Sequence, residues 1–228
     1  DTTINLFWKN ATPKTSAKTT NPGTIFNEIT STSQINYKHV EYPFNDYNIQ
    51  RLAPQKYSQQ GPHIAVGDIN NDGLEDFFIG GAINFSGEIF TQQNGQKFTS
   101  SQLIDSQKME EDIDCIFFDA DNDQDQDLLI TGGDIQYSEN SINYKPRLYL
   151  NDGEGHFTLQ AYAIPDSIKT IASCVSSADF DGDGDQDLFI GGRVSKSYPM
   201  APRSYLLQNN NGVFTDVTSK ICPELLHP

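Results

Sequence analysis

Three stretches of the chain repeat almost the same acidic pattern: DINNDGLED at residues 68–76, DADNDQDQD at residues 119–127 and DFDGDGDQD at residues 179–187. Each stretch places carboxylates or amides at alternate positions of a short loop. Oxygen ligands spaced in this way suit a hard cation such as calcium. We therefore predict that each of the three loops binds one calcium ion.

An acidic turn that binds nothing is the alternative reading of such a loop, since Asp and Asn favour turns in any case. The second and third loops, however, each carry five acids within nine residues. Carboxylates at this density repel one another strongly unless a cation lies among them. The repetition of the pattern at matching positions therefore favours metal binding.

The sequence around each loop is typical of β-strands. The runs DFFIGG, DLLITGG and DLFIGG follow the three loops, and another apolar run precedes each loop. An EF-hand loop begins with the same acidic spacing, but it needs a Glu at position 12 and flanking helices. Position 12 is here Ile79, Ile130 or Ile190. The loops are thus predicted to be hairpins of a repeated β unit.

These features resemble the FG-GAP/VCBS repeat family, whose units are β-propeller blades with a DxDxDGxxD calcium loop, as in the integrin α-subunit head. The resemblance covers about residues 61–218. It implies calcium ligation by the side chains at loop positions 1, 3, 5 and 9 and by the backbone carbonyl at position 7. The implied ligands are Asp68, Asn70, Asp72, Leu74 and Asp76 in the first loop, Asp119, Asp121, Asp123, Asp125 and Asp127 in the second, and Asp179, Asp181, Asp183, Asp185 and Asp187 in the third.

The second loop departs from the pattern at position 6. Gly73 and Gly184 occupy this position in the first and third loops, whereas the second loop has Gln124. A sharp turn that requires a positive φ suits glycine, and another residue adopts it at a cost in free energy. We therefore expect the second loop to bind calcium more weakly or with altered geometry.

The repeats predict an all-β fold of β-propeller blades. Within residues 61–228 we expect three complete four-stranded blades, at about residues 61–102, 111–163 and 171–218. A closed propeller has at least four blades. The chain is therefore expected to be part of a larger propeller, or an open arc that needs missing blades or a partner chain to complete it.

The N-terminal region lies outside this repeat. Residues 1–23 are rich in Thr, Lys, Asn and Pro and predict an extended arm. Residues 24–60 are expected to form a closing strand and an irregular excursion. The stretch TIFNEITS resembles VFTDVTS at the end of the third unit and is the predicted closing strand, and the aromatic residues that follow it are predicted to pack on the propeller surface.

Charge narrows the range of partners. The chain has 31 acidic and 15 basic residues and a formal net charge of −16. Three calcium ions would still leave a net charge of about −10, which argues against nucleic acid and anionic membranes as partners. No stretch is long and apolar enough for a transmembrane helix.

Calcium loops of modest affinity favour an extracellular, periplasmic or cell-surface location, because cytosolic calcium is too low to fill them. The chain has three cysteines, an odd number that allows at most one disulfide. Cys115 and Cys174 precede the second and third loops, where small strand residues belong. We predict that both are buried and unpaired.

Function is expected at the loops that join the second and third strands of each blade, residues 82–87, 134–146 and 193–203. They vary in length and carry large apolar side chains that could contact a ligand, namely Phe85, Tyr137, Tyr144, Tyr198 and Met200. We predict a binding or adhesion module for a protein or glycan ligand on this face. The alternative is part of a secreted polysaccharide-degrading enzyme, although the scattered histidines and the absence of known catalytic motifs do not support catalysis.

Overall fold

A computed structural model describes residues 26–94, 96–103, 108–196, 200 and 202–226. These residues form three four-stranded antiparallel sheets, each with its strands in chain order. Unit one comprises β1 (Ile64–Gly67), β2 (Asp76–Ile79), β3 (Glu88–Gln93) and β4 (Lys97–Gln102). Unit two comprises β5 (Asp112–Phe118), β6 (Asp127–Gly132), β7 (Arg147–Leu150) and β8 (Thr158–Leu159). Unit three comprises β9 (Ala172–Ala178), β10 (Asp187–Gly192), β11 (Tyr205–Gln208) and β12 (Thr215–Asp216). The prediction of an all-β fold with three four-stranded units is confirmed.

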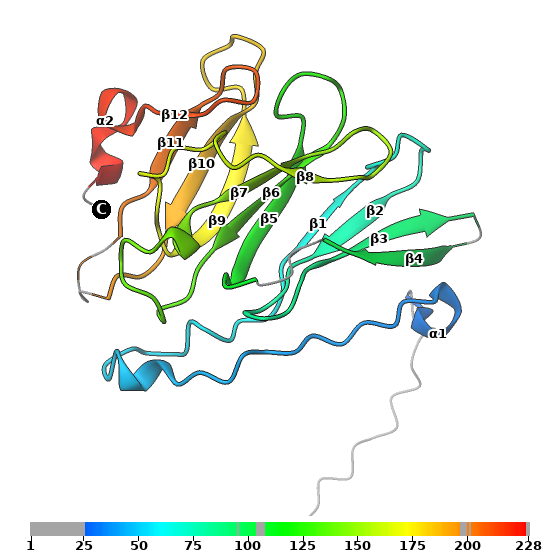
Figure 1. Ribbon diagram of the computed structural model, residues 1–228, viewed down its shortest axis with the longest axis horizontal. Coiled ribbons are helices and arrows are strands. Elements are labelled where there is room, and N and C mark those ends of the chain that lie inside the picture. Colours follow the sequence, from blue (N-terminus) through cyan, green and yellow to red (C-terminus); the bar gives the residue numbers. More distant parts are fainter. Residues whose placement is uncertain (1–25, 95, 104–107, 197–199, 201, 227–228) are drawn as a thin grey trace, which may run out of the picture.

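The three sheets lie face to face, with unit two between units one and three (Figure 1). Alternate residues of each strand point to opposite faces of the sheet, so each unit offers one apolar face to each neighbour. The core between units one and two contains Ala65, Ile69, Phe78, Ile89, Cys115, Leu128, Ile130 and Tyr149. The core between units two and three contains Phe118, Ala120, Leu129, Leu148, Val175, Leu188, Ile190 and Leu207.

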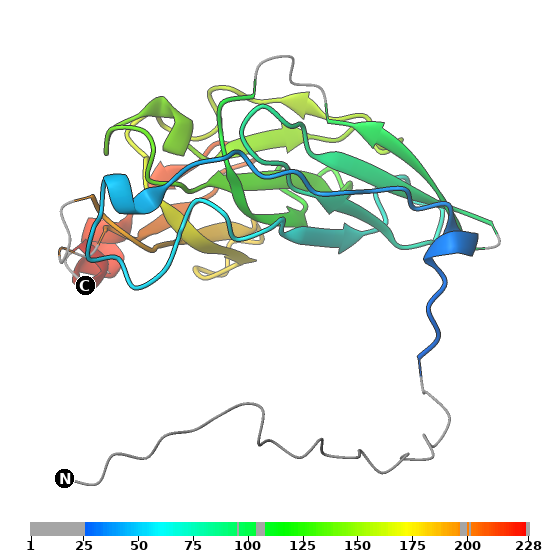
Figure 2. The ribbon, with the colours of Figure 1, turned by 90° about the horizontal axis from the view of Figure 1, so that it is seen from below.

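The three acidic loops lie together along one edge of the sheets, because each joins the first strand of its unit to the second (Figure 1). The loops that join the second strand to the third, and one unit to the next, lie along the opposite edge. We call these the acidic edge and the variable edge. Residues 34–60 run along the variable edge (Figures 1 and 2).

This N-terminal excursion is irregular and packs on the sheets. Tyr37 makes an edge-to-face contact with Phe90, with 6.1 Å between ring centroids. Phe44 and Tyr57 pack against a small apolar cluster on the variable edge. A short 3₁₀ helix, η2 (Asp46–Asn48), lies between them, and the buried Asp46 carboxylate accepts the backbone N–H of Ser58 at 3.0 Å.

The predicted closing strand does not form in the described part of TIFNEITS. Its last residues begin the helix α1 (Thr30–Ser33), and the carboxylate of Glu28 accepts the backbone N–H of Thr30 at 2.7 Å. The stretch that it resembles behaves in the same way, since β12 is short and α2 (Thr218–Ile221) follows it. There the carboxylate of Asp216 accepts the N–H of Thr218 at 3.0 Å. The two similar stretches therefore share a helical turn, although only VFTDVTS contributes a strand among the described residues.

A buried ionic network joins units one and two at the variable edge. The carboxylate of Asp112 pairs with Lys108 at 3.2 Å and with Arg147, and it accepts the backbone N–H of Gly81 at 2.7 Å. The neighbouring Glu111 carboxylate is also buried and accepts the N–H of Ile83 at 3.1 Å. Buried charges that are paired in this way fix the register of the two units rather than add much stability.

The cysteine prediction was half right. All three cysteines are unpaired; Cys115 is buried in the core between units one and two, but Cys174 is exposed. By strand register the residue equivalent to Cys115 is the buried Val175, so Cys174 lies on the opposite face of its sheet, which no unit among the described residues covers. Among the described residues, no helix is long and apolar enough to span a membrane.

Candidate metal centres

The last aspartate of each loop anchors the loop to its own sheet. Asp76, Asp127 and Asp187 are buried at the start of the second strand. Each accepts the backbone N–H of loop position 2, at 3.2, 2.8 and 3.1 Å respectively. The other carboxylate oxygen accepts a backbone N–H from the end of the third strand, at 2.6, 2.9 and 2.7 Å. The same two bonds in all three units explain why position 9 is always Asp.

The first aspartate of each loop holds the turn closed. Asp68, Asp119 and Asp179 each accept the backbone N–H of position 6, at 2.8, 3.0 and 3.1 Å. The aspartates at position 5 accept the N–H of position 7 at 2.8 to 2.9 Å in all three loops. These bonds curl the backbone of each loop around its first and fifth residues.

Two of the loops gather carboxylates closely enough to hold a cation. One ligand oxygen each from Asp119, Asp121 and Asp127 lies within 4.8 Å of the others. The same holds for Asp179, Asp181 and Asp183. Both groups include loop position 3, which is the amide Asn70 in the first loop. The first loop therefore has one negative charge fewer for a cation, although the amide oxygen is itself a calcium ligand type.

The second loop contains buried carboxylate oxygens that lack a hydrogen-bond partner. Among the described residues, Oδ1 of Asp119 and Oδ1 of Asp121 are buried and receive no hydrogen bond. Burial raises the pKa of Asp121, and the nearby charges of Asp123 and Asp119 raise it further. Burial also raises the pKa of Asp127, to about 7. Unpartnered buried carboxylate oxygens are costly, and a divalent cation would satisfy them, so these residues fit calcium.

The turn residue at position 6 has a positive φ in every loop. The angles are 83° at Gly73, 75° at Gln124 and 101° at Gly184. A positive φ suits glycine, and the second loop places a glutamine in this left-handed region. Such a residue carries a conformational cost of about 1 to 2 kcal/mol.

The side chains at position 7 have a role that sequence reasoning missed. Nδ2 of Asn71, at position 4 of the first loop, donates to Oδ1 of Asp125 at 2.9 Å. Asn122 of the second loop donates in the same way to Asp185 of the third. The resemblance assigned only the backbone carbonyl of position 7 to calcium. The recurrence of Asn at position 4 and Asp at position 7 in successive loops was the available signal.

Asn side chains at the end of the third strand add a second link between units. Nδ2 of Asn151 donates to the carbonyl of Ile69 at 2.7 Å, and Nδ2 of Asn209 donates to the carbonyl of Ala120 at 2.8 Å. Both asparagines are buried. The first and second acidic loops are thus each fixed by their own sheet and by the unit that follows.

Two pockets of the variable edge lie beside units two and three. One, of about 340 Å³, is lined by Ile142 and Lys145 from the loop before β7, by Leu159 of β8, and by Tyr162 and Asp166 from the region between β8 and β9. The other, of about 230 Å³, lies between units two and three and includes Lys169, Arg203 and Tyr205. Of the apolar residues predicted to contact a ligand, Tyr144 is buried and packs against Tyr137, whereas Phe85 and Met200 are exposed. Tyr198 lies outside the described residues.

Stacked four-stranded β units, each with an acidic loop between its first two strands, define a class of β-repeat proteins. The FG-GAP-like repeat family matches this chain at residues 68–130 and 119–190. The chain belongs to this family. No protein with a curated description matches it.

Proposed function

We propose that this chain is part of a calcium-stabilised β-propeller that serves as a binding module for a protein or glycan ligand. The observation that carries the proposal is the threefold recurrence of the same acidic loop, with the same anchoring hydrogen bonds, on units that stack face to face. Four-stranded sheets arranged in this way fit propeller blades. The calcium ions would stabilise the hairpins by neutralising the carboxylates.

The proposed dependence on calcium also indicates where the protein would work. A module that depends on calcium at modest affinity works outside the cytosol, in the extracellular space, in the periplasm or on the cell surface. The ligand would bind at the variable edge, where loops on a rigid scaffold supply recognition.

The pocket of about 340 Å³ is the best candidate for the ligand site. Tyr162 is 95% exposed beside it, and its aromatic ring offers a flat apolar surface at low entropic cost. Lys145 and Asp166 form an ion pair of 2.6 Å at the same pocket. Small-ligand sites combine an apolar lining with a few polar groups of this kind. The combination suits a sugar ring or an extended peptide segment.

A polysaccharide-degrading enzyme is the second candidate, and the same ion pair is the observation that favours it. A lyase or hydrolase would need a general acid or base in this region. The hydrogen bond from Lys145, however, lowers the pKa of Asp166, which leaves its carboxylate ionised and committed to the lysine. Asp166 is also largely exposed. These properties support binding rather than acid catalysis.

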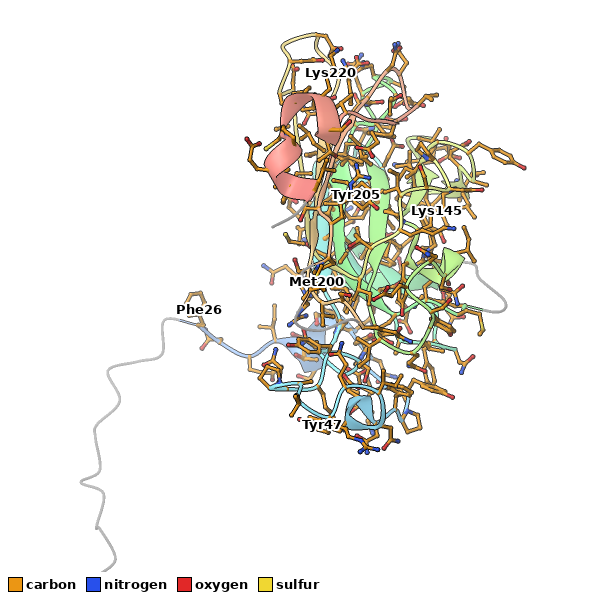
Figure 3. The ribbon with its side chains drawn as sticks, turned by 90° about the vertical axis from the view of Figure 1, so that its left-hand side faces the viewer. Phe26, Tyr47, Lys145, Met200, Tyr205 and Lys220 are labelled. Carbon is orange, nitrogen blue, oxygen red and sulfur yellow. The ribbon has the colours of Figure 1, made fainter. Side chains whose placement is uncertain are left out.

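The proposal is tested on a glycan array and a peptide array, each probed with calcium and with chelator. We expect retention on one ligand class in calcium, and its loss after Tyr162→Ala. The matched control is Tyr47→Ala, since Tyr47 is also an exposed tyrosine but lies away from Lys145 (Figure 3). Turnover of a bound polysaccharide would favour the enzyme, and equal loss of binding in both variants would exclude the pocket.

A further inference from the structure

Two segments of the variable edge carry bases but no acid. They are residues 47–60, the last part of the N-terminal excursion, and residues 193–203, the loop after β10. Their bases are Arg51, Lys56, Arg193, Lys196 and Arg203. Acids outnumber bases by 31 to 15 in the whole chain, so the two segments reverse its charge locally. The proposed ligand pocket beside Tyr162 contains no residue of either segment.

The two segments pack against each other. Nε2 of Gln50 donates to the backbone carbonyl of Ser195. The guanidinium of Arg193 lies 5.1 Å from the centre of the Tyr57 ring and donates to the side chain of Gln60. Contacts from both segments therefore join them into one surface, and the ring and the amide hold Arg193 in place.

Four of the five bases have no carboxylate partner in this structure. Among the residues that the structure describes, Arg203 pairs with Asp216, whereas Arg51, Lys56, Arg193 and Lys196 form no ion pair. Of the acids in this region, Asp46 and Asp134 are buried. Glu139 accepts the hydroxyl of Ser195 at 2.8 Å. The four bases thus offer positive charge to a second molecule.

A small pocket lies beside two of these bases. Its volume is about 170 Å³, and it is lined by Ile49, Gln50, Arg51, Leu52, Ala53 and Lys196. Leu52 is 82% exposed, and Ile49 is also exposed. We call this pocket and the four unpaired bases the basic patch. An exposed aliphatic side chain surrounded by charged groups is the arrangement of an apolar anchor with a polar rim, which protein interfaces use.

The chemistry of the basic patch favours an acidic peptide segment as its occupant. Carboxylates would pair with Arg51 and Lys196, and an apolar side chain of the same segment would cover Leu52. A sulfated glycan would pair with the bases, but its polar rings would leave Leu52 uncovered. A long polyanion such as nucleic acid would also be repelled by the acids of the rest of the chain, whereas a short segment contacts only the patch.

The N-terminal residues of this chain do not have the required charge. Residues 1–25 contain the bases Lys9, Lys14 and Lys18 and the single acid Asp1. The basic patch is also separate from the proposed ligand pocket, since Tyr47, at the start of one segment, lies away from Lys145 (Figure 3). The occupant is therefore a segment of another molecule, and it would bind beside the ligand of the proposed function rather than in its place.

We propose that the basic patch is a docking surface for a short acidic and apolar peptide segment of a partner protein. The bases would attract the segment and fix its orientation. Leu52 and Ile49 would supply apolar area that becomes buried on binding. The N-terminal excursion, which carries most of the patch, would then act in recognition as well as in packing.

The test measures the binding of a short fluorescein-labelled peptide, in which Glu and Leu alternate, to the full chain by fluorescence anisotropy. We expect saturable binding that weakens as the salt concentration rises, because exposed ion pairs are screened. The same peptide with Gln in place of Glu should bind about tenfold more weakly, the combined loss expected for two exposed ion pairs.

Variants of the chain locate the site. Arg51→Glu combined with Lys196→Glu should weaken binding of the Glu–Leu peptide about tenfold or more. Lys97→Glu combined with Lys220→Glu is the matched control, because both lysines are exposed, lie outside the patch and give the same change of net charge. Leu52→Ser should weaken binding several-fold. Tyr162→Ala should leave it unchanged, which separates this surface from the proposed ligand pocket.

Four results would overturn the proposal. The first is an absence of saturable binding, and the second is an equal loss in the two charge-reversal variants, which would show attraction by net charge alone. The third is tighter binding of dextran sulfate that Leu52→Ser leaves unchanged, which would assign the patch to a sulfated polymer. The fourth is a dimer in sedimentation that Leu52→Ser dissociates, which would assign it to a second copy of the chain.

Discussion

Asn71 in the first acidic loop donates its side-chain N–H to the carboxylate of Asp125 in the second, across the boundary between two units, at 2.9 Å. Asn122 and Asp185 repeat this contact between the second and third loops. The carboxylates at position 7 therefore act between units, whereas the other acids of each loop act within it. Neighbouring acidic loops are therefore joined by hydrogen bonds along one edge of the molecule.

This link predicts a coupling free energy between Asn71 and Asp125. In a double-mutant cycle with Asn71→Ala and Asp125→Ala, measured by denaturant unfolding in saturating calcium, we expect a coupling of about 1 kcal/mol. The cycle of Asn71→Ala with Asp185→Ala is the control, because these residues do not share a bond and their effects should add. Equal coupling in the two cycles would contradict a direct contact.

The strained turn in the second loop predicts that Gln124→Gly strengthens calcium binding there. The residue has a φ of 75°, which glycine adopts freely, so the gain should be about 1 kcal/mol or roughly fivefold in affinity. Calcium titration of the variant measures it. Gly184→Gln in the third loop is the reciprocal control and should weaken its site, because the φ of 101° there disfavours glutamine. A Cβ at this position meets open space, so a steric clash does not contribute. An affinity that falls or stays constant in Gln124→Gly would refute the strain argument.

The buried asparagines predict a large effect on stability. Asn209→Ala removes the bond to Ala120 and leaves that carbonyl unpaired, and it also removes the bond that Asn209 Oδ1 receives from Gly212 at 2.9 Å. We expect the free energy of unfolding to fall by about 2 to 4 kcal/mol. Asn210→Ala changes an exposed side chain next to it and should cost under about 0.5 kcal/mol. Similar losses in both variants would show that the inter-unit bond does not matter.

The buried carboxyl group of Glu111 predicts a pH dependence. Burial raises its pKa from 4.5 to about 8. Between these values the folded state holds a proton that the unfolded state has lost, so the contribution of this group to stability falls as the pH rises through that range. Glu111→Gln removes this dependence. Compared with the parent protein, the variant should therefore gain on the order of 2 kcal/mol in the free energy of unfolding between pH 5 and pH 8. Parallel pH profiles of Glu111→Gln and the parent protein would contradict it. The exposed Glu154→Gln serves as control.

Much of the fold could be predicted because the acidic loops fix the phase of every repeat. Once Asp76, Asp127 and Asp187 are placed at the start of a second strand, the apolar runs on each side become strands, and the structure confirms all three units. The repeated pattern also located the carboxylates that lie close together. Local sequence carries this information because each loop is held mainly by bonds to its own backbone.

The remaining features depend on contacts between distant residues. The stretch TIFNEITS was predicted to be a strand from its likeness to VFTDVTS, but a strand needs a neighbour with free backbone groups, and the Glu28 bond to Thr30 favours a helical turn instead. The burial of Cys174 was wrongly predicted because Cys174 is one position out of register with Cys115 and therefore lies on the opposite face of its sheet. The cross-unit bonds of Asn71 and Asn209 join residues more than fifty positions apart, which no local pattern reveals.

Calcium titration of metal-free protein, followed by thermal unfolding, tests the central claim most directly. We expect calorimetry to show three bound ions, and the melting temperature to rise with calcium, since each filled site adds about 2.7 kcal/mol at a hundredfold excess over its dissociation constant. Asp121→Asn and Asp181→Asn should each weaken one site and leave the others intact. Identical melting curves in calcium and in chelator, with no heat of binding, would contradict the account.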